Sequence, residues 1–279
     1  MRSDLLVTTE WLADRINAPG MAIVDGSFKM PSVTPTAFED YQARHIPGAV
    51  FFDVDAIADK STSLPHMLPA AASFSEAIID MGIDDQTEIV VYDTAGLMSA
   101  RVWWTFRVFG HGKIRILDGG LKKWIAEGRP VTSTISSVTA ASVFNAKLNL
   151  ERVRNKKQMI EIAADRSRQI IDARSKARFL AEEKEPRAGL RSGHIPGSFN
   201  LPFSELTNSD GTVKSDEALR DLFVAAGLDL ERPVVTTCGS GVTAAGLFFA
   251  LEILGKSDVS LYDGSWSEWG QPGDTPVEP

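Results

Sequence analysis

The chain of 279 residues contains a single cysteine, Cys238. One thiol excludes an internal disulfide and a zinc cluster built on several cysteines. Basic residues are also in the minority, because 29 lysines and arginines stand against 37 aspartates and glutamates, a formal net charge of −8. No stretch concentrates the basic residues, so neither nucleic acid nor an anionic membrane surface is an expected partner.

Long hydrophobic runs are lacking as well. Asp4 stands where a signal peptide would begin its apolar region, and the most apolar later run, Ala244 to Leu254, is short and contains Glu252. Export and a membrane span are therefore not indicated, and we expect a cytoplasmic location. With 43% hydrophobic and 24% charged residues, the composition is typical of a globular chain that buries a core.

An internal repeat indicates how the chain is organised, since the length alone allows about two domains or one α/β barrel. Four motifs recur in the same order, at offsets between 144 and 149 residues, which indicates duplication. We predict two homologous domains over 1–140 and 155–279, joined by a linker over 141–154. The matched segments are His45-Ile46-Pro47-Gly48 with His194-Ile195-Pro196-Gly197, Ala22–Asp25 with Gln169–Asp172, Ile89–Tyr92 with Pro233–Thr236, and Asp118-Gly119-Gly120 with Asp263-Gly264-Ser265.

Each copy alternates short β-branched runs with segments of helical periodicity. Apolar residues recur on one helical face at Val102, Phe106 and Phe109, and again at Leu247, Leu251 and Leu254. Strands that alternate with helices predict an α/β fold, in which each domain is a mostly parallel sheet with helices on both faces. The predicted strands include Ile89–Tyr92, Ile114–Leu117, Val234–Thr237 and Val259–Tyr262.

Cys238 lies between a predicted strand and a predicted helix, in a turn of small residues. Open α/β sheets bind ligands at the carboxyl ends of their strands. Gly239 and Gly241 allow backbone N–H groups to face inward beside the positive end of the helix, and such a ring favours an anion at the sulfur. The alternative is an inert buried cysteine, which is a common structural role. The position at a strand–turn–helix junction favours a reactive thiol.

Ala244 argues against a cysteine-dependent phosphatase, which has a thiolate loop of the same length. A phosphatase loop needs arginine at the sixth position after the cysteine, because a dianionic phosphate requires a bidentate guanidinium. This chain has Ala244 at that position. The donors of the loop are therefore the neutral backbone and the Ser240 hydroxyl, which suit a small singly charged species on sulfur.

Together, these motifs resemble those of tandem-domain rhodanese-like sulfurtransferases, and within them of 3-mercaptopyruvate sulfurtransferases. The resemblance spans nearly the whole chain. Its most specific motif is the loop 238–243, because thiosulfate-using relatives typically carry two basic residues where Gly239 and Ser240 stand. The resemblance implies that Cys238 carries sulfur from 3-mercaptopyruvate as a persulfide and releases pyruvate, with no cofactor or metal. It also implies substrate binding by Gly239, Gly241, Val242 and Thr243.

The first copy is predicted to be catalytically silent, because Thr94 is the residue matched to Cys238. This copy nevertheless carries Asp55 and His66, which the second copy lacks. The resemblance implies that Ser240, His66 and Asp55 form a relay of hydroxyl, imidazole and carboxylate that moves protons. Without the resemblance, the residues favour a surface-loop histidine and a helix cap.

Two arginines, Arg178 and Arg187, precede the second His-Ile-Pro-Gly motif. The resemblance implies that they hold the carboxylate and carbonyl of the substrate, for which a planar guanidinium is suited. The alternative is a solvated charged loop. His45 and His194 belong to the repeated motif, and we assign both a structural role because the silent copy retains one of them.

A chain with one cysteine cannot resolve a persulfide internally. The sulfur acceptor must therefore be external, and a small thiol, a thioredoxin-like protein and cyanide are the candidates. Two other functions remain open. One is a thiosulfate:cyanide sulfurtransferase that uses the same cysteine, and the other is a non-enzymatic sulfur carrier or interaction module.

Overall fold

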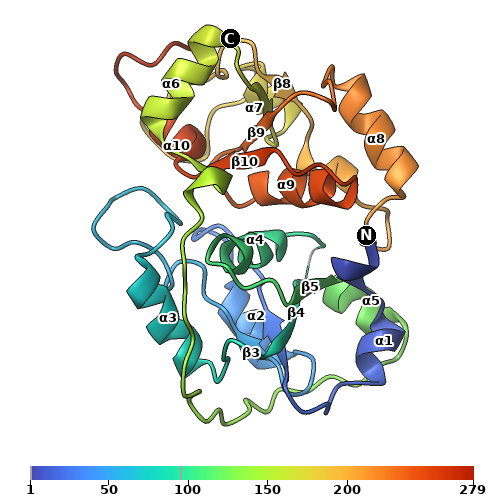
Figure 1. Ribbon diagram of the computed structural model, residues 1–279. Helices are drawn as coiled ribbons and strands as arrows, with labels where there is room; N and C mark the ends of the chain where they lie inside the picture. Colours follow the sequence, from blue (N-terminus) through green and yellow to red (C-terminus); the bar gives the residue numbers. More distant parts are fainter. Residues whose placement is uncertain (1, 95) are drawn as a thin grey trace. The chain divides into compact units, whose positions relative to one another are not determined.

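A computed structural model describes residues 2–94 and 96–279 of the chain (Figure 1). By their internal contacts these residues form two compact units. The first unit comprises residues up to 59 together with 68–148 and 207–213, and the second comprises 60–67, 149–206 and 214–279. Each unit therefore contains one copy of the repeat and one short segment from the other half of the sequence, an exchange that the sequence did not predict. The boundaries at 140 and 155 stay a prediction.

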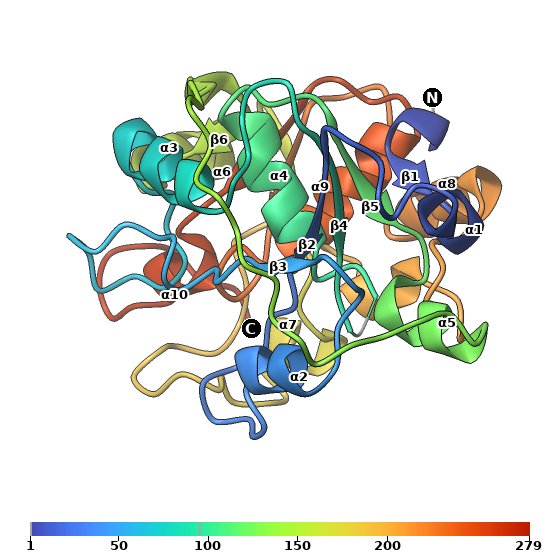
Figure 2. The same ribbon diagram turned by 90° about the horizontal axis from the view of Figure 1, so that it is seen from below.

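The described part of the first unit is built on a parallel sheet with the strand order β1-β5-β4-β2-β3, which can be followed from below in Figure 2. Neighbouring strands pair in parallel throughout, for example Asp25 with Tyr92. The strands are β1 (Leu6–Val7), β2 (Met21–Asp25), β3 (Val50–Phe51), β4 (Glu88–Tyr92) and β5 (Ile114–Leu117).

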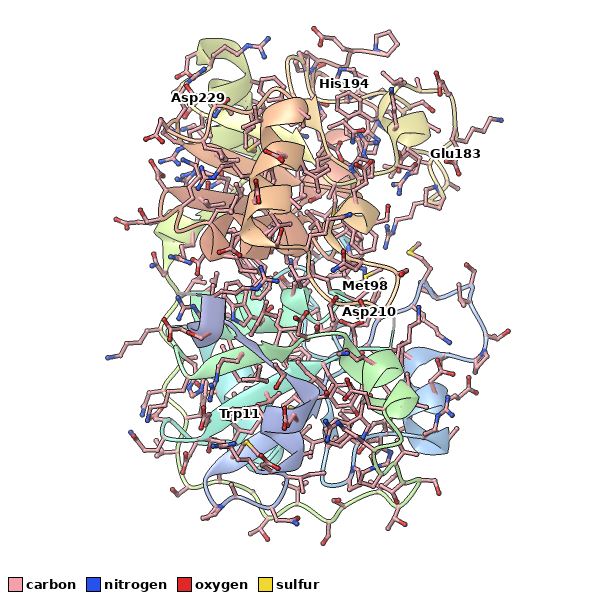
Figure 3. All side chains as sticks on the ribbon, turned by 90° about the vertical axis from the view of Figure 1, so that its right-hand side faces the viewer. Trp11, Met98, Glu183, His194, Asp210 and Asp229 are labelled. Carbon is pink, nitrogen blue, oxygen red and sulfur yellow. The ribbon has the colours of Figure 1, made fainter. Side chains whose placement is uncertain are left out.

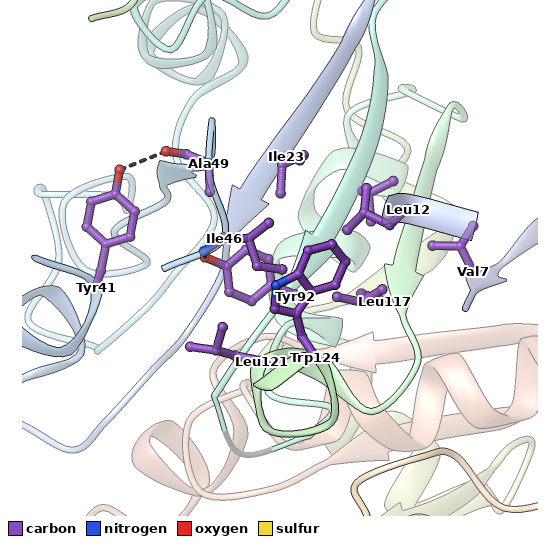
Figure 4. Close-up of a cluster of buried hydrophobic side chains, with 11 residues drawn as sticks. Val7, Leu12, Ile23, Tyr41, Ile46, Ala49, Tyr92, Leu117, Leu121 and Trp124 are labelled. Carbon is purple, nitrogen blue, oxygen red and sulfur yellow. Dashed lines mark hydrogen bonds between the residues drawn. The ribbon is translucent and has the colours of Figure 1, made fainter. Parts of the chain in front are cut away.

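Helices cover both faces of this sheet. On one face, Val90 and Tyr92 of β4 pack with α1, α2 and α5, and Tyr41 of α2 donates a hydrogen bond to the carbonyl of Ala49 at 2.8 Å (Figure 4). On the other face, Val91 of β4 and Val102 of α4 both lie close to Gly26. Alternate residues of one strand thus serve opposite layers, as a parallel sheet buried on both sides requires. The helices are α1 (Thr9–Ala13), α2 (Ala37–Ala43), α3 (Ala71–Asp80), α4 (Ala100–Val108) and α5 (Gly120–Ala126), after a short η1 (Arg2–Asp4).

The described part of the second unit repeats this plan with the order β6-β10-β9-β7-β8. Capping boxes start a helix in each unit, with Thr36 and Glu39 at α2 and Asn155 and Gln158 at α6. The strands are β6 (Val153–Arg154), β7 (Gln169–Asp172), β8 (Phe199–Asn200), β9 (Val234–Thr237) and β10 (Val259–Tyr262). The helices are η2 (Leu150–Arg152), α6 (Lys156–Asp165), α7 (Lys176–Phe179), η3 (Phe203–Leu206), α8 (Asp216–Ala225), α9 (Ala244–Ile253) and α10 (Ser265–Trp269).

The predicted α/β fold, with a parallel sheet and helices on both faces in each domain, is confirmed. The helix α9 differs from expectation, because its sequence suggests one apolar face at Leu247 and Leu251. In the structure every residue of α9 except Glu252 is buried, since Phe248 and Phe249 make the helix apolar around its whole circumference. Among the described residues, no helix has the length and apolar character needed to cross a membrane.

Candidate functional site

The cysteine loop occupies the carboxyl end of β9, in the second unit. Cys238 directly follows the strand, and α9 begins six residues later at Ala244. The Cys238 side chain is buried, with 2% of the residue exposed, and the Gly241 N–H donates to its Sγ at 3.1 Å. Gly241 has φ +83°, a backbone conformation that favours glycine, which explains why the loop needs this residue there. A backbone donor at the sulfur is what the sequence predicts for this loop.

The start of α10 holds the backbone of Cys238 in place. The Ser265 hydroxyl accepts a hydrogen bond from the Cys238 N–H at 3.2 Å and donates one to the Tyr262 carbonyl at 2.8 Å. The Trp266 N–H donates to the Cys238 carbonyl at 2.9 Å. Both sides of the cysteine are therefore anchored, by the last residue of the repeated Asp-Gly-Ser motif and by Trp266 directly after it. The sequence analysis assigned no catalytic role to this motif.

The rest of the loop also lies within this unit. Ser240 is buried, with 6% of the residue exposed, and its predicted role in the relay stays a prediction. Val242 is buried, and Thr243 precedes the first residue of α9. The substrate-binding roles predicted for Gly239, Gly241, Val242 and Thr243 stay predictions.

Arg178 lies directly at the cysteine loop. It belongs to α7, and its Nη2 atom is 3.0 Å from the position that a Cβ atom on Gly239 would take. The absence of a side chain at Gly239 leaves room for the guanidinium. Glu185 binds this guanidinium through both of its oxygens, with 3.2 Å between Nε and Oε1. The structure brings Arg178 and the loop together, and its role toward substrate stays a prediction.

A buried ion cluster lies behind Arg178, and the sequence did not predict it. Arg174, whose side chain is fully buried, contacts Asp172 at 2.6 Å and Glu185 at 2.7 Å, and it stacks on Trp266 at 4.2 Å. Burial opposes the charge on Arg174, but the two carboxylates outweigh it and the pKa of Arg174 is raised. The signal in the sequence was Asp-x-Arg at the end of the repeated segment Gln169–Asp172.

Arg187 and His66 contact each other within the second unit, to which the segment 60–67 belongs. The Nη2 atom of Arg187 is 3.2 Å from Nε2 of His66. A guanidinium can only donate, so Nε2 is the acceptor and a neutral His66 carries its proton on Nδ1. Asp55 belongs to the first unit, where its N–H binds Asp53 at 2.9 Å. The relay of Ser240, His66 and Asp55 stays a prediction.

The residue matched to Cys238 in the first copy needs a correction. Asp25 pairs with Tyr92 as Asp172 pairs with Thr237, so the residue after the strand is Asp93 in the first copy and Cys238 in the second. The Asp93 carbonyl accepts from the Leu121 N–H at 2.9 Å, as the Cys238 carbonyl does from Trp266. The prediction of Thr94 was wrong because the first loop has one more residue before its helix, which shifts the sequence offset by one.

Asp93 fills the first loop with a carboxylate. It is 1% exposed, and its Oδ2 accepts from the Ser99 N–H at 2.7 Å. The Asp93 carboxyl group thus accepts a backbone N–H of its loop, as the sulfur of Cys238 does in the second copy. Because the one thiol of the chain is Cys238, the first loop has no cysteine nucleophile, and its own carboxylate competes with any incoming anion.

The two histidines of the repeated motif are buried and packed. His45 contacts the Tyr41 carbonyl through Nδ1 at 2.6 Å, and His194 contacts the Phe179 carbonyl at 2.9 Å. Each ring stacks on the aromatic ring of the same partner, at 4.1 Å and 3.8 Å. This equivalent packing in both copies agrees with the structural role assigned to them.

Comparison with known proteins identifies the family. The family model of the rhodanese-like domain matches residues 8–127 and 155–272. The chain is 42% identical over 303 residues to thiosulfate/3-mercaptopyruvate sulfurtransferase 1, mitochondrial, of Arabidopsis thaliana, covering 99% of this chain and 78% of that protein. It is 43% identical over 272 residues to thiosulfate sulfurtransferase of Bos taurus, covering 95% of this chain and 91% of that protein.

A solved structure agrees with these relatives. The crystal structure of SseA from Escherichia coli, described as showing the rhodanese fold and the catalytic mechanism of 3-mercaptopyruvate sulfotransferases, has a TM-score of 0.86 at 38% identity. The match covers 94% of this chain and 98% of that one. The predicted duplication and the predicted sulfurtransferase class are confirmed, and the chain belongs to the rhodanese family of sulfurtransferases, with two tandem copies of the family's domain.

Proposed function

We propose that the protein transfers sulfur from 3-mercaptopyruvate to an external thiol or cyanide through a persulfide on Cys238. The observation that carries this proposal is the buried Cys238 Sγ, which accepts the Gly241 N–H at 3.1 Å in a loop without a basic side chain. Such a loop stabilises negative charge on sulfur with neutral donors, and it suits a small monoanionic donor better than a dianion.

In the proposed reaction the Cys238 thiolate attacks the thiol sulfur of 3-mercaptopyruvate. The new sulfur–sulfur bond forms as the carbon–sulfur bond breaks, and the electron pair of the broken bond passes to the enolate of pyruvate. A proton then reaches this enolate, with Ser240 and its predicted partners His66 and Asp55 as the path. Arg178 and Arg187 hold the carboxylate and carbonyl, and pyruvate leaves the persulfide behind.

The second half of the cycle needs an external acceptor, because Cys238 is the single cysteine of the chain. A thiolate or cyanide attacks the outer sulfur and restores the Cys238 thiolate. A small thiol or a thioredoxin-like protein fits this role. The cytoplasmic location expected from the sequence is likewise part of the proposal, and cell fractionation tests it.

Substitution of the nucleophile tests the proposal directly. Cys238→Ser should abolish pyruvate release from 3-mercaptopyruvate and also the mass gain of one sulfur atom per chain on treatment with the donor. The measurement is pyruvate formation together with intact-protein mass spectrometry. Thr94→Ser, next to Asp93 in the silent copy, is the control and should keep both. Sulfur transfer by the serine variant would contradict the persulfide mechanism.

The donor is tested by comparing kcat/KM for 3-mercaptopyruvate and thiosulfate with the same acceptor. Some relatives at about 40% identity are named for thiosulfate and others for 3-mercaptopyruvate. The ratio of the two kcat/KM values therefore decides which donor this protein prefers. A preference for thiosulfate would favour the alternative donor and overturn the argument from the neutral loop. Multiple turnovers with either donor exclude a role as a carrier or interaction module alone.

A further inference from the structure

The buried ion cluster of the second unit contains four charged side chains whose formal charges cancel. Asp172 and Glu185 are the anions, and Arg174 and Arg178 are the cations. The side chains of Asp172, Arg174 and Glu185 are at most 2% exposed, whereas that of Arg178 is 20% exposed. Arg178 is therefore the member of the cluster that reaches solvent, and it does so at the cysteine loop.

Glu185 is the residue that connects the two arginines. Its Oε1 accepts from Arg174 Nη1 at 2.7 Å and from Arg178 Nε at 3.2 Å, and its Oε2 accepts from Arg178 Nη2. The Nε edge of the Arg178 guanidinium is thus occupied by a carboxylate from the protein. The same Nη2 atom lies 3.0 Å from the position of a Cβ on Gly239, so the guanidinium stands at the loop with its positive charge already paired.

A paired charge affects mono- and dianionic ligands differently. The Coulomb interaction of a ligand with a nearby charge is proportional to the charge of the ligand, so a dianion gains about twice as much as a monoanion from an unpaired cation. When the cation is paired with a buried carboxylate, this difference is reduced, whereas the hydrogen bonds from the guanidinium remain. Because the Glu185 side chain is buried, solvent screens its charge poorly. Glu183, labelled in Figure 3, and Lys184 on the same loop are exposed.

We propose that Glu185 is a specificity-determining residue that disfavours dianionic sulfur donors by cancelling the charge of Arg178 beside Gly239. This inference rests on the proposed sulfur transfer at Cys238. It adds a second determinant to the loop, which lacks basic side chains at Gly239 and Ser240. The donor that fits both features is a monoanion that can accept hydrogen bonds from a guanidinium.

The test is Glu185→Gln, which removes the charge and keeps an oxygen acceptor. We expect the ratio of kcat/KM for thiosulfate to kcat/KM for 3-mercaptopyruvate to rise roughly tenfold, as an added unit charge several ångströms from the ligand implies. Glu183→Gln makes the same change in net charge at an exposed position of the same loop and should leave the ratio within about twofold of wild type. Glu185→Asp keeps the charge and should keep the ratio, even where both activities fall.

Three outcomes overturn the inference: an unchanged ratio in Glu185→Gln, an equal fall in both activities, or the same rise in Glu183→Gln. Should Glu185→Gln fail to fold, Arg178→Met provides the test, because it leaves the cluster of Asp172, Arg174 and Glu185 with a net negative charge beside the loop and should lower thiosulfate turnover more than 3-mercaptopyruvate turnover. Equal losses for the two donors would then count against the role of Glu185. Failure of the proposed function itself is distinguishable, since the wild-type protein would then prefer thiosulfate or turn over neither donor, whatever the variants do.

Discussion

At the residue scale, the two copies differ in the partner of a buried aspartate at the end of an equivalent strand. Asp172 ends β7 and is bound by the guanidinium of Arg174, whereas Asp25 ends β2 and has Ser27 in the position of that arginine. Both carboxylates accept the backbone N–H two residues later, at 2.9 Å. The first copy thus has the same backbone turn after its strand, but Ser27 provides no cation beside the aspartate. Burial raises the pKa of Asp25 to about 6, although hydrogen bonds from Ser27 lower it.

This raised pKa predicts that the first unit loses stability as the pH rises through 6. The pKa of Asp25 is higher in the folded state than its ordinary value of 3.8, so the folded state binds the proton more tightly. Its contribution is complete below the unfolded pKa and is lost above about pH 6. The free energy of unfolding of Asp25→Asn, taken relative to that of wild type, should therefore rise by about 1 to 2 kcal/mol from pH 5 to pH 7.5.

Urea unfolding at both pH values measures this gain. Asp221→Asn, at an exposed position of α8, is the control and should show no comparable change with pH. A constant difference between Asp25→Asn and wild type at the two pH values would show that Asp25 does not titrate in this range.

At the scale of elements, α5 and α10 begin in the same way but with different residues. Gly120 and Ser265 both have positive φ, 55° and 46°. A Cβ on Gly120 would lie 2.4 Å from the Asp93 carbonyl oxygen, so the first copy has no room for a side chain there. The second copy accepts the strain of a serine because its hydroxyl binds the Cys238 N–H. The first residue of the helix therefore only avoids a steric clash in the first copy, whereas in the second copy it binds the backbone of Cys238.

Two substitutions separate the hydroxyl of Ser265 from the strain of its backbone. Ser265→Ala loses the buried hydrogen bonds and keeps the strained φ, whereas Ser265→Gly loses the bonds and relieves the strain. We expect the alanine variant to be less stable than the glycine variant by about 1 kcal/mol, from urea unfolding. Both variants should lower turnover, because the Cys238 backbone is released. An alanine variant as stable as the glycine variant would show that this φ carries no strain.

At the scale of the whole molecule, the exchanged segments tie each unit to the other half of the sequence. Residues 207–213 follow η3 of the second copy but belong to the first unit. The Val213 N–H donates to the Asp118 carboxylate at 2.7 Å, and its carbonyl accepts from Arg2 at 2.7 Å. Burial raises the pKa of Asp118, and this N–H counteracts the shift. The stability of the first unit therefore depends on residues from the second half.

Removal of this N–H tests that dependence. Val213→Pro should destabilise the first unit by about 1 to 3 kcal/mol, because a half-buried carboxylate loses its donor. Hydrogen exchange measured by mass spectrometry should show faster exchange around Asp118. Val213→Ala retains the N–H and serves as the control for the lost side chain. Equal exchange in the proline and alanine variants would mean that the Val213 N–H does not support the first unit.

Much of the fold could be predicted from the sequence, because it depends on local patterns. The strand Val234–Thr237 and the loop after it follow from β-branched residues and glycines, which act within a few residues. The burial of α9 on all sides and the contact of Arg187 with His66 depend on residues distant in sequence. Patterns of a single segment do not report such contacts.

The sequence by itself determined the duplication, the α/β class and the unique position of Cys238, because repeats, periodicity and residue types are local or countable. The tertiary structure alone decided that Asp93 is the counterpart of Cys238, since a loop longer by one residue can be aligned only through the strand register. It also decided that Glu185 pairs the charge of Arg178 at Gly239. Charges compensate one another through distance and burial, and neither quantity is set by separation along the chain.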